Sequence, residues 1–250
     1  IRADLIIGNN VLGHVPDIND FVEGLKIALG HKGIITMEFP HLVRLIEGKQ
    51  FDTIYHEHFS YLSCTTVGRI LKSRGLELFD VEELTTHGGS LRIFVKHQDD
   101  KSKSISTRVQ NLLEKEADAG ISHLSFYAGF QNEVDKIRAD FLKFLIEAKA
   151  QSQKVIGYGA AAKGTTLINY AGLKGNDLIQ FVVDASPHKQ GKYLPGSHIP
   201  VYGIEKINEY RPNYIIILPW NIKKEISAQL HYCRSWGAKF VTFIPDLLIS

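Results

Sequence analysis

The segment from Phe51 to Tyr61 holds the side chains of this sequence that are best suited to acid–base chemistry. Two imidazoles, a carboxylate and two phenols stand within seven residues: Tyr55, His56, Glu57, His58 and Tyr61. Histidine titrates closest to neutral pH, and a neighbouring carboxylate or phenol can orient an imidazole that acts as a general base. The alternative is a solvated loop, or a helix start with packed aromatic rings. Because a folding pattern does not need so many ionisable groups together, we favour a catalytic role.

A metal site is a weaker interpretation of the same segment. His56 and His58 are two positions apart, so both could reach one ion only from an extended segment. No CxxC or HExxH motif accompanies them, and we therefore predict no metal site in this chain. The two cysteines, Cys64 and Cys233, lie far apart in the sequence. They indicate neither a disulfide framework nor a cysteine zinc site, and they favour a reducing, cytoplasmic location.

A second polar group follows the first predicted strand, Leu5–Ile7. Asn9, Asn10 and His14 come directly after it, and Glu38 stands at the end of the next predicted strand. Ligands of open α/β sheets bind at the carboxyl ends of the strands. Turn chemistry explains the asparagines and His14 equally well when they are taken alone. With Glu38 beside them on the same edge, we favour a site.

Two further segments combine glycine with polar side chains. The first is a turn whose members can approach and bind a polyol or a phosphate: His87, Gly88, Gly89, Ser90 and Arg92. A plain glycine-rich hairpin turn explains it equally well. The second leads from a strand into a helix start, where free N–H groups favour a phosphate: Gly157, Gly159, Ala160 and Lys163. It is loosely like GxGxxA, with Asp184 at the end of the next strand, as in dinucleotide-binding domains.

The elements that must position these groups alternate between strand and helix. In the first part we predict strands over 5–7 and 34–38, helices over 21–29 and 65–75, and a hairpin-like return of 76–81 with 91–96. A helix over 124–150 follows. In the last part we predict strands over 155–159, 179–184, 214–218 and 239–244, and helices over 161–170 and 222–236. The fold class is therefore α/β, with a first part over 1–100, a helical linker over 101–150 and a Rossmann-like domain over 151–250.

The composition of the 250 residues is that of a soluble globular protein, since 44% are hydrophobic and 22% are charged. These values exclude a disordered chain, a collagen-like repeat and a membrane-spanning protein. The formal charge of +2 produces no field that favours a nucleic acid or a membrane surface as partner. A partner must therefore be recognised by local groups.

Five motifs of this sequence occur together in one order: Asn9–Asp17, Glu38–His41, Phe51–Tyr61, His87–Arg92 and Gly157–Thr165. In this order they resemble the S-adenosylmethionine-dependent C-methyltransferases of nucleotide-activated deoxysugars. The resemblance covers essentially the whole chain. It implies the second half of a class I methyltransferase sheet, followed by a helical bridge and a Rossmann-like domain.

The resemblance also implies roles for the residues singled out above. It makes His58 the base and places Tyr55, Glu57 and His14 around the sugar, with Asn9 and Asn10 toward the cofactor. Substrate contacts fall on the two glycine-bearing segments: His87, Gly88, Gly89, Ser90, Arg92, Gly157, Gly159, Ala160 and Lys163.

The implied cofactor is S-adenosylmethionine. The sequence contains neither the GxGxG loop that holds this cofactor in the family nor the family's cysteine-rich zinc module. It opens at Ile1, without methionine, and enters an apolar run at once. We therefore expect the C-terminal portion of a longer enzyme, inactive alone, with the main cofactor loop and any zinc in the missing portion.

The expected reaction is methylation of a thymidine-diphosphate-linked 4-keto-6-deoxy sugar at a carbon α to the ketone, either C3 or C5. His58 would remove the α proton, and Tyr55 or His14 would donate a hydrogen bond to the enolate oxygen. One rival is a nicotinamide-dependent oxidoreductase with its cofactor on Gly157, Gly159 and Asp184. Another is a sugar-nucleotide-binding module without catalysis.

Overall fold

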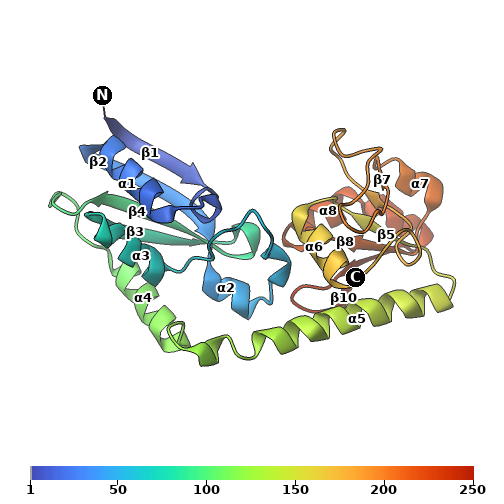
Figure 1. Ribbon diagram of the computed structural model, residues 1–250. Coiled ribbons are helices and arrows are strands. Elements are labelled where there is room, and N and C mark those ends of the chain that lie inside the picture. The colour runs from blue at the N-terminus through green and yellow to red at the C-terminus, as the bar shows by residue number, and fades with distance from the viewer. Residues whose placement is uncertain (1) are drawn as a thin grey trace. The chain divides into compact units, whose positions relative to one another are not determined.

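The computed structural model describes residues 2–250, which divide into two compact units. The first unit takes in the residues up to Gly48 together with His56–Phe130, and the second comprises Lys49–Tyr55 and Gln131–Ser250. The chain therefore enters the second unit briefly at Lys49–Tyr55 and returns to the first at His56, within the segment Phe51–Tyr61. Each unit is α/β, which confirms the predicted fold class (Figure 1).

The first unit is built on a four-stranded sheet in the order β1-β2-β4-β3. The strands are β1 (Ala3–Asn9), β2 (Leu29–Pro40), β3 (Leu76–Leu84) and β4 (Ser90–His97). β1 pairs with β2 in parallel, whereas β4 runs antiparallel to both β2 and β3. The expected hairpin-like return of the last two strands is thus confirmed.

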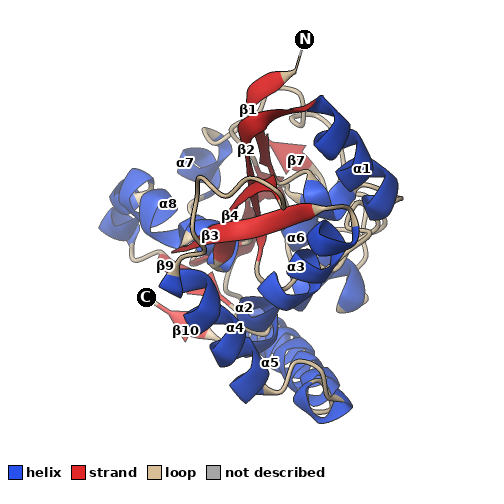
Figure 2. Cartoon of the chain, turned by 90° about the vertical axis from the view of Figure 1, so that its left-hand side faces the viewer, coloured by secondary structure: helices blue, strands red, loops and turns tan. Residues whose placement is uncertain are grey.

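Helices cover one face of this sheet. They are α1 (Ile18–Ala28), α3 (Cys64–Ser73) and α4 (Thr107–Ala119), and Figure 2 shows α1 and α3 beside the strands. Alternate strand residues enter the core shared with these helices: Ile35, Met37, Phe39, Leu91, Ile93 and Val95. The period of two gives each strand one buried face, and the strand ends are thereby held at fixed positions. A short helix, α2 (Leu42–Glu47), follows β2.

Two predicted boundaries in this unit are wrong. β2 begins at Leu29 and ends at Pro40, so it is longer at both ends than the strand predicted over 34–38. α3 begins at Cys64 and ends at Ser73, not at 65 and 75 as predicted, and its cap is Ser63, whose hydroxyl accepts the Thr66 N–H at 3.1 Å.

The second unit carries a six-stranded sheet in the order β10-β9-β8-β5-β6-β7. The strands are β5 (Val155–Tyr158), β6 (Val182–Val183), β7 (Val201–Tyr202), β8 (Tyr214–Ile217), β9 (Lys239–Thr242) and β10 (Leu248–Ile249). All pair in parallel except β10 with β9. The chain runs from β5 to β6 on one side and later returns to β8 on the other. The strand order therefore reverses at β5 and β8, which is the point where doubly wound sheets bind ligands.

The helices of this unit are α5 (Phe130–Ala150), α6 (Ala162–Tyr170), α7 (Lys206–Tyr210) and α8 (Lys223–Gln229). β7, α7 and β10 were not predicted, and the strand predicted over 179–184 is reduced to β6. The helix predicted over 222–236 ends at Gln229, and a 3₁₀ helix, His231–Trp236, follows it with Cys233 fully buried.

The predicted helix over 124–150 is also divided. A 3₁₀ turn occupies Leu124–Phe126, where the Tyr127 hydroxyl donates to the Ile121 carbonyl at 2.7 Å, and α5 starts only at Phe130. α4 belongs to the first unit and α5 to the second, where the Phe144 ring packs edge-on against Tyr214. The domain limits given above stay a prediction.

Two general properties complete the fold. Over residues 2–250, every helix is too short or too polar to span a bilayer. Within the same range, no three side chains of His, Cys, Asp or Glu gather as metal ligands do.

Candidate functional site

The parallel pairing of β1 and β2 brings their carboxyl ends together. Asn9 lies opposite Glu38 in the register, and the Asn10 N–H donates to the Glu38 carbonyl at 2.7 Å. Asn10 then turns the chain out of the sheet with φ +56°, a conformation that asparagine tolerates better than most residues. Two of the polar groups predicted to share this edge therefore do so.

Glu38 joins this edge to the first glycine-bearing segment. Its side chain is buried; one carboxylate oxygen accepts from the Thr86 hydroxyl at 2.8 Å and the other from the Arg92 guanidinium at 2.9 Å. Both oxygens are thus engaged within the protein. Glu38 therefore links β2 to β4, and its carboxylate is the counter-charge of Arg92.

The turn at Thr86–Gly88 places His87 beside Asn10. The Asn10 amide donates to His87 Nε2, at 3.2 Å, while the Asn10 Oδ1 atom is buried and has no hydrogen-bond partner among residues 2–250. Gly89 has φ +123°, and a Cβ atom there would lie 2.8 Å from the Arg44 Cβ. Glycine is therefore required at this position both by its backbone angle and by the close approach of Arg44.

The second part of the segment Phe51–Tyr61 packs against the loop after β1. The Gly13 carbonyl accepts from the N–H groups of Phe59 at 2.8 Å and Ser60 at 3.2 Å. These bonds hold the His58 ring edge-on to His14, with centroids 4.7 Å apart and planes at 78°. The Tyr61 ring stands 6.0 Å from His58 on centroids. The structure therefore brings together three of the ionisable residues that the sequence separates by up to 47 positions.

The other members of this segment have different surroundings. His56 and Glu57 are exposed, and Tyr55 is half-buried. The division of the chain assigns Tyr55 to the second unit and His56 to the first. A role for Glu57 in orienting His58 stays a prediction, as does the role of Tyr55.

A buried pair that sequence reasoning missed supports this edge. His41 Nε2 lies 2.7 Å from a Glu116 oxygen, and Glu116 also accepts from the backbone N–H groups of Cys64 at 2.7 Å and Thr65 at 2.8 Å. Burial by itself raises the pKa of Glu116, but the hydrogen bonds from His41, Thr65 and Cys64 outweigh it, and the pKa is lowered. His41 is buried, so it does not lie on a solvated helix face.

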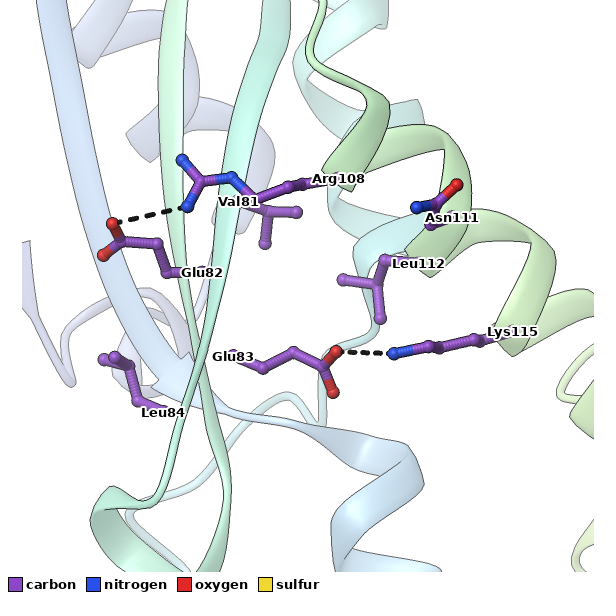
Figure 3. Close-up of a pocket in the computed structure, with 8 residues that line it drawn as sticks. All are labelled: Val81, Glu82, Glu83, Leu84, Arg108, Asn111, Leu112 and Lys115. Carbon is purple, nitrogen blue, oxygen red and sulfur yellow. Dashed lines mark hydrogen bonds and ion pairs between the residues drawn. The ribbon is translucent and has the colours of Figure 1, made fainter.

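A hollow of about 340 Å³ lies between β3 and α4 in the same unit (Figure 3). Its charged side chains pair with one another: Arg108 with Glu82 at 3.7 Å, and Lys115 with Glu83 at 2.8 Å. These pairs leave the hollow with balanced charge, and nothing in its chemistry selects a ligand.

In the second unit, the turn Gly157–Thr165 connects β5 to α6 as predicted. Gly159 has φ +92°, and a Cβ atom there would lie 2.6 Å from the Pro219 ring. The turn thus lies directly against the end of β8, as the close packing of a doubly wound sheet requires. The backbone N–H of Ala160 donates to an Asp184 oxygen at 2.7 Å.

Asp184 is engaged by its own loop. One carboxylate oxygen accepts from the Ser186 N–H at 2.8 Å, and the other accepts from Ala160 and from Lys189 Nζ at 3.2 Å. The carboxylate therefore closes the turn before α6. A ribose-binding acid would need this group to face a ligand.

Lys163, in the first turn of α6, lies at the point where the strand order reverses. Its Nζ donates to the Asn221 Oδ1 atom at 3.1 Å and stands 4.5 Å from the centroid of the Trp220 ring. Trp220 in turn donates its indole N–H to Asp52 at 2.8 Å. Sequence reasoning missed Asp52, Trp220 and Asn221; the position of Trp220 just past a buried strand was the available signal.

Residues 85–245 match the model of the family described as "C-methyltransferase C-terminal domain". The chain is 34% identical over 244 residues to C-methyltransferase NovU of Streptomyces niveus, a match that covers 98% of this chain. The chain spans 58% of the length of that relative.

Two solved structures show weaker similarity. The structure of LepI in complex with SAM matches 39% of this chain and 27% of its own, with a TM-score of 0.33 and 13% identity. The structure of TnmH matches 38% of this chain and 30% of its own, with a TM-score of 0.30 and 19% identity.

Proposed function

The chain belongs to the C-methyltransferase family, and from this premise we propose that it serves the S-adenosylmethionine-dependent C-methylation of a nucleotide-linked 4-keto-6-deoxy sugar. The observation that carries the proposal is the contact of His58 with His14, beside the polar ends of β1 and β2. A base held at that edge suits a reaction that begins with removal of a proton from carbon.

The choice of substrate follows from what carbon methylation requires. A sugar carbon becomes nucleophilic when it is α to a ketone, because loss of its proton gives an enolate. In a 4-keto-6-deoxy sugar both C3 and C5 satisfy this condition. The rest of the proposed substrate is a thymidine diphosphate, whose negative charge needs cationic or N–H partners.

His58 is the proposed base. Its ring is held by the Gly13 bonds to the next two residues and by edge contacts to His14 and Tyr61. An oriented general base contributes roughly 10²- to 10⁴-fold in rate. His14, at 4.7 Å on ring centroids, and Tyr55 are the proposed donors to the enolate oxygen, where one such donor contributes roughly 3–4 kcal/mol. Glu57 is proposed to support the imidazolium that forms.

The residues present fit part of an S-adenosylmethionine site. The buried Asn10 Oδ1 atom lacks a donor within residues 2–250, so it can accept a hydrogen bond from an N–H or O–H of a bound group. We propose that Asn10 and the exposed Asn9 hold the cofactor at the end of β1. When bound, this cofactor supplies an electrophilic methyl group on a sulfonium.

The proposed substrate contacts lie on both glycine-bearing segments. In the first unit they are His87, Gly88, Gly89, Ser90 and Arg92, which we propose face the sugar. In the second unit they are Gly157, Gly159, Ala160 and Lys163, which we propose meet the diphosphate. The ammonium of Lys163, held by Asn221 and Trp220, gives the second set its positive charge.

The test is replacement of His58 by Asn in the natural-length protein. We expect loss of methyl transfer and loss of exchange of the substrate's α proton with deuterated water, followed by NMR. His31→Asn is the matched control, because the His31 ring also lies beside a histidine ring, that of His97, but near the amino end of β2. Exchange that continues unchanged in the His58 variant would remove His58 as the base.

The oxidoreductase interpretation makes a different prediction. It assigns a ribose to Asp184, whose oxygens already accept from Ala160, Ser186 and Lys189. NADH titration separates the two: micromolar affinity would favour the oxidoreductase. A binding module without catalysis would bind thymidine diphosphate in the natural-length protein and turn nothing over.

A further inference from the structure

The Asp52 carboxylate is buried in the second unit, and only part of its hydrogen-bonding capacity is used. Its side chain is 1% exposed; one oxygen accepts from the Trp220 indole, and the other has no hydrogen-bond partner within the described residues. A buried charge with incomplete partners opposes folding. Residues that break a folding rule in this way are concentrated at functional sites.

The contacts around Asp52 lead to Lys163. Asp52 holds the indole through its N–H, at 2.8 Å, and the face of that indole carries the Lys163 ammonium at 4.5 Å. Asn221, next to Trp220, accepts from the same ammonium at 3.1 Å. The Asp52 side chain is also close enough for its charge to raise the pKa of Lys163 against the lowering effect of burial. Three side chains from two short segments, Phe51–Thr53 and Trp220–Ile222, thus surround one amine.

A second lysine of this unit, Lys154, shows what distinguishes the surroundings of Lys163. Lys154 also lies over an aromatic ring, 4.8 Å from the Tyr210 centroid, and donates to a carbonyl at 3.1 Å. It precedes β5, at the amino edge of the sheet, and is exposed. Lys163 stands at the carboxyl edge, where the strand order reverses. The buried carboxylate accompanies only the lysine on the side where ligands bind.

The other charged groups near this cluster are already paired. Lys49, in the same segment as Asp52, bonds Glu133 of α5 at 2.8 Å and Asp246 at 2.9 Å. Asp184, which closes the turn before α6, is paired with Lys189. The charges that face one another at the cluster itself are therefore those of Asp52 and Lys163.

We propose that Asp52 and Trp220 are positioning residues for Lys163: the buried carboxylate fixes the indole, and the indole face with Asn221 aims the ammonium at the diphosphate of the substrate. This inference rests on the proposed function, which assigns the diphosphate to Lys163. The negative charge of Asp52 has a second effect, because it keeps Lys163 protonated in surroundings that would otherwise favour the neutral amine. Asp52 itself need not touch the ligand.

The experiment measures thymidine diphosphate binding to the chain by calorimetry at several pH values. Lys163→Met should weaken binding roughly 10- to 100-fold, as expected for loss of a charged hydrogen bond. Trp220→Phe keeps an aromatic face but loses the donor to Asp52, and should weaken binding roughly 3- to 10-fold. Asp52→Asn keeps the shape and should shift the alkaline loss of affinity to lower pH.

Matched controls come from the opposite edge of the sheet. Lys154→Met removes a lysine from an aromatic face, and Trp236→Phe removes an indole whose N–H donates to the Pro212 carbonyl at 3.1 Å. Both should bind thymidine diphosphate as the unaltered chain does. In the Trp236→Phe background Trp220 is the remaining tryptophan, so its fluorescence reports both ligand binding and the fold of the Lys163→Met and Asp52→Asn variants.

The outcomes separate the inference from the proposed function. If Lys163→Met binds as tightly as Lys154→Met, the diphosphate assignment itself is wrong. If Lys163→Met loses binding but Asp52→Asn and Trp220→Phe keep both the affinity and its pH profile, the positioning role is wrong while the assignment stands. Loss of affinity in Trp220→Phe with a shifted alkaline limb in Asp52→Asn supports both.

Discussion

The two most deeply buried acidic side chains among the described residues lie one in each unit, and they behave in opposite ways. Glu116 and Asp52 are both 1% exposed. Glu116 accepts from His41, Cys64 N, Thr65 N and the Thr65 hydroxyl, and its pKa is lowered. Asp52 accepts from Trp220 on one oxygen, the other has no partner among residues 2–250, and its pKa is raised to about 6.

The difference shows that burial alone does not define the role of an acid. In both residues removal from water raises the pKa, and donors to the charged form lower it. Four donors reverse the effect of burial at Glu116, where the carboxylate ties α3 and α4 to the end of β2. At Asp52, the indole and the charge of Lys163 reduce the effect without cancelling it. The first acid stabilises the fold, and the second is retained at the expense of stability.

Glu116→Gln should give the largest change in the free energy of unfolding. The amide that replaces one oxygen cannot accept from the N–H groups at the start of α3, so we expect the free energy of unfolding at pH 7 to fall by about 3 kcal/mol. Because the folded pKa is lowered, the stability contributed by Glu116 is present above the unfolded value of 4.5 and lost as pH falls through the folded value. Urea unfolding at pH 7 and pH 4 measures this, with the exposed Glu114→Gln as control. An equal loss in both variants would contradict a structural role for Glu116.

Asp52→Asn should raise the free energy of unfolding at pH 7, whereas Glu116→Gln lowers it. The folded pKa of about 6 exceeds the unfolded value of 3.8, so the charged carboxylate destabilises the fold progressively as pH rises between them. The amide cannot ionise, and we expect the variant to be more stable than the unaltered chain by up to about 3 kcal/mol at pH 7. Near pH 4 the two should be nearly equal. A variant that is less stable at pH 7 would place Asp52 with Glu116 among the structural acids.

Ser63→Ala should give the smallest change in the free energy of unfolding. It compares the two side chains that cap α3, Glu116 and Ser63. Glu116 accepts from the first N–H groups of this helix, and the Ser63 hydroxyl accepts from the next one, at Thr66. Loss of a neutral cap lowers stability by about 1 kcal/mol. Unlike the effect of Glu116, it should not depend on pH between 4 and 7, because the hydroxyl does not titrate. Thermal unfolding at both pH values distinguishes the two caps.

Much of the architecture followed from local patterns. Apolar runs with polar residues at their ends predicted the strands and the edge where Asn10 and Glu38 meet, because parallel strands end at one edge of a sheet. Glycine spacing predicted the turn from β5 into α6. The same patterns failed where tertiary packing chose between alternatives: 124–150 had helical spacing throughout, yet a compact turn precedes α5 at Phe130. Short strands such as β7 carry too few residues to show a period.

The sequence by itself determined the α/β class, the family and the residue types available for chemistry, because these depend on periodicity and on motif order along the chain. The tertiary structure alone decided which of those groups act together. His14 and His58 meet through bonds to Gly13, and Asp52 reaches Trp220 across 168 positions of sequence. A carboxylate has its ordinary pKa in an unfolded chain. Whether folding makes it a support, as in Glu116, or a strained charge, as in Asp52, depends on donors that only the folded chain brings near.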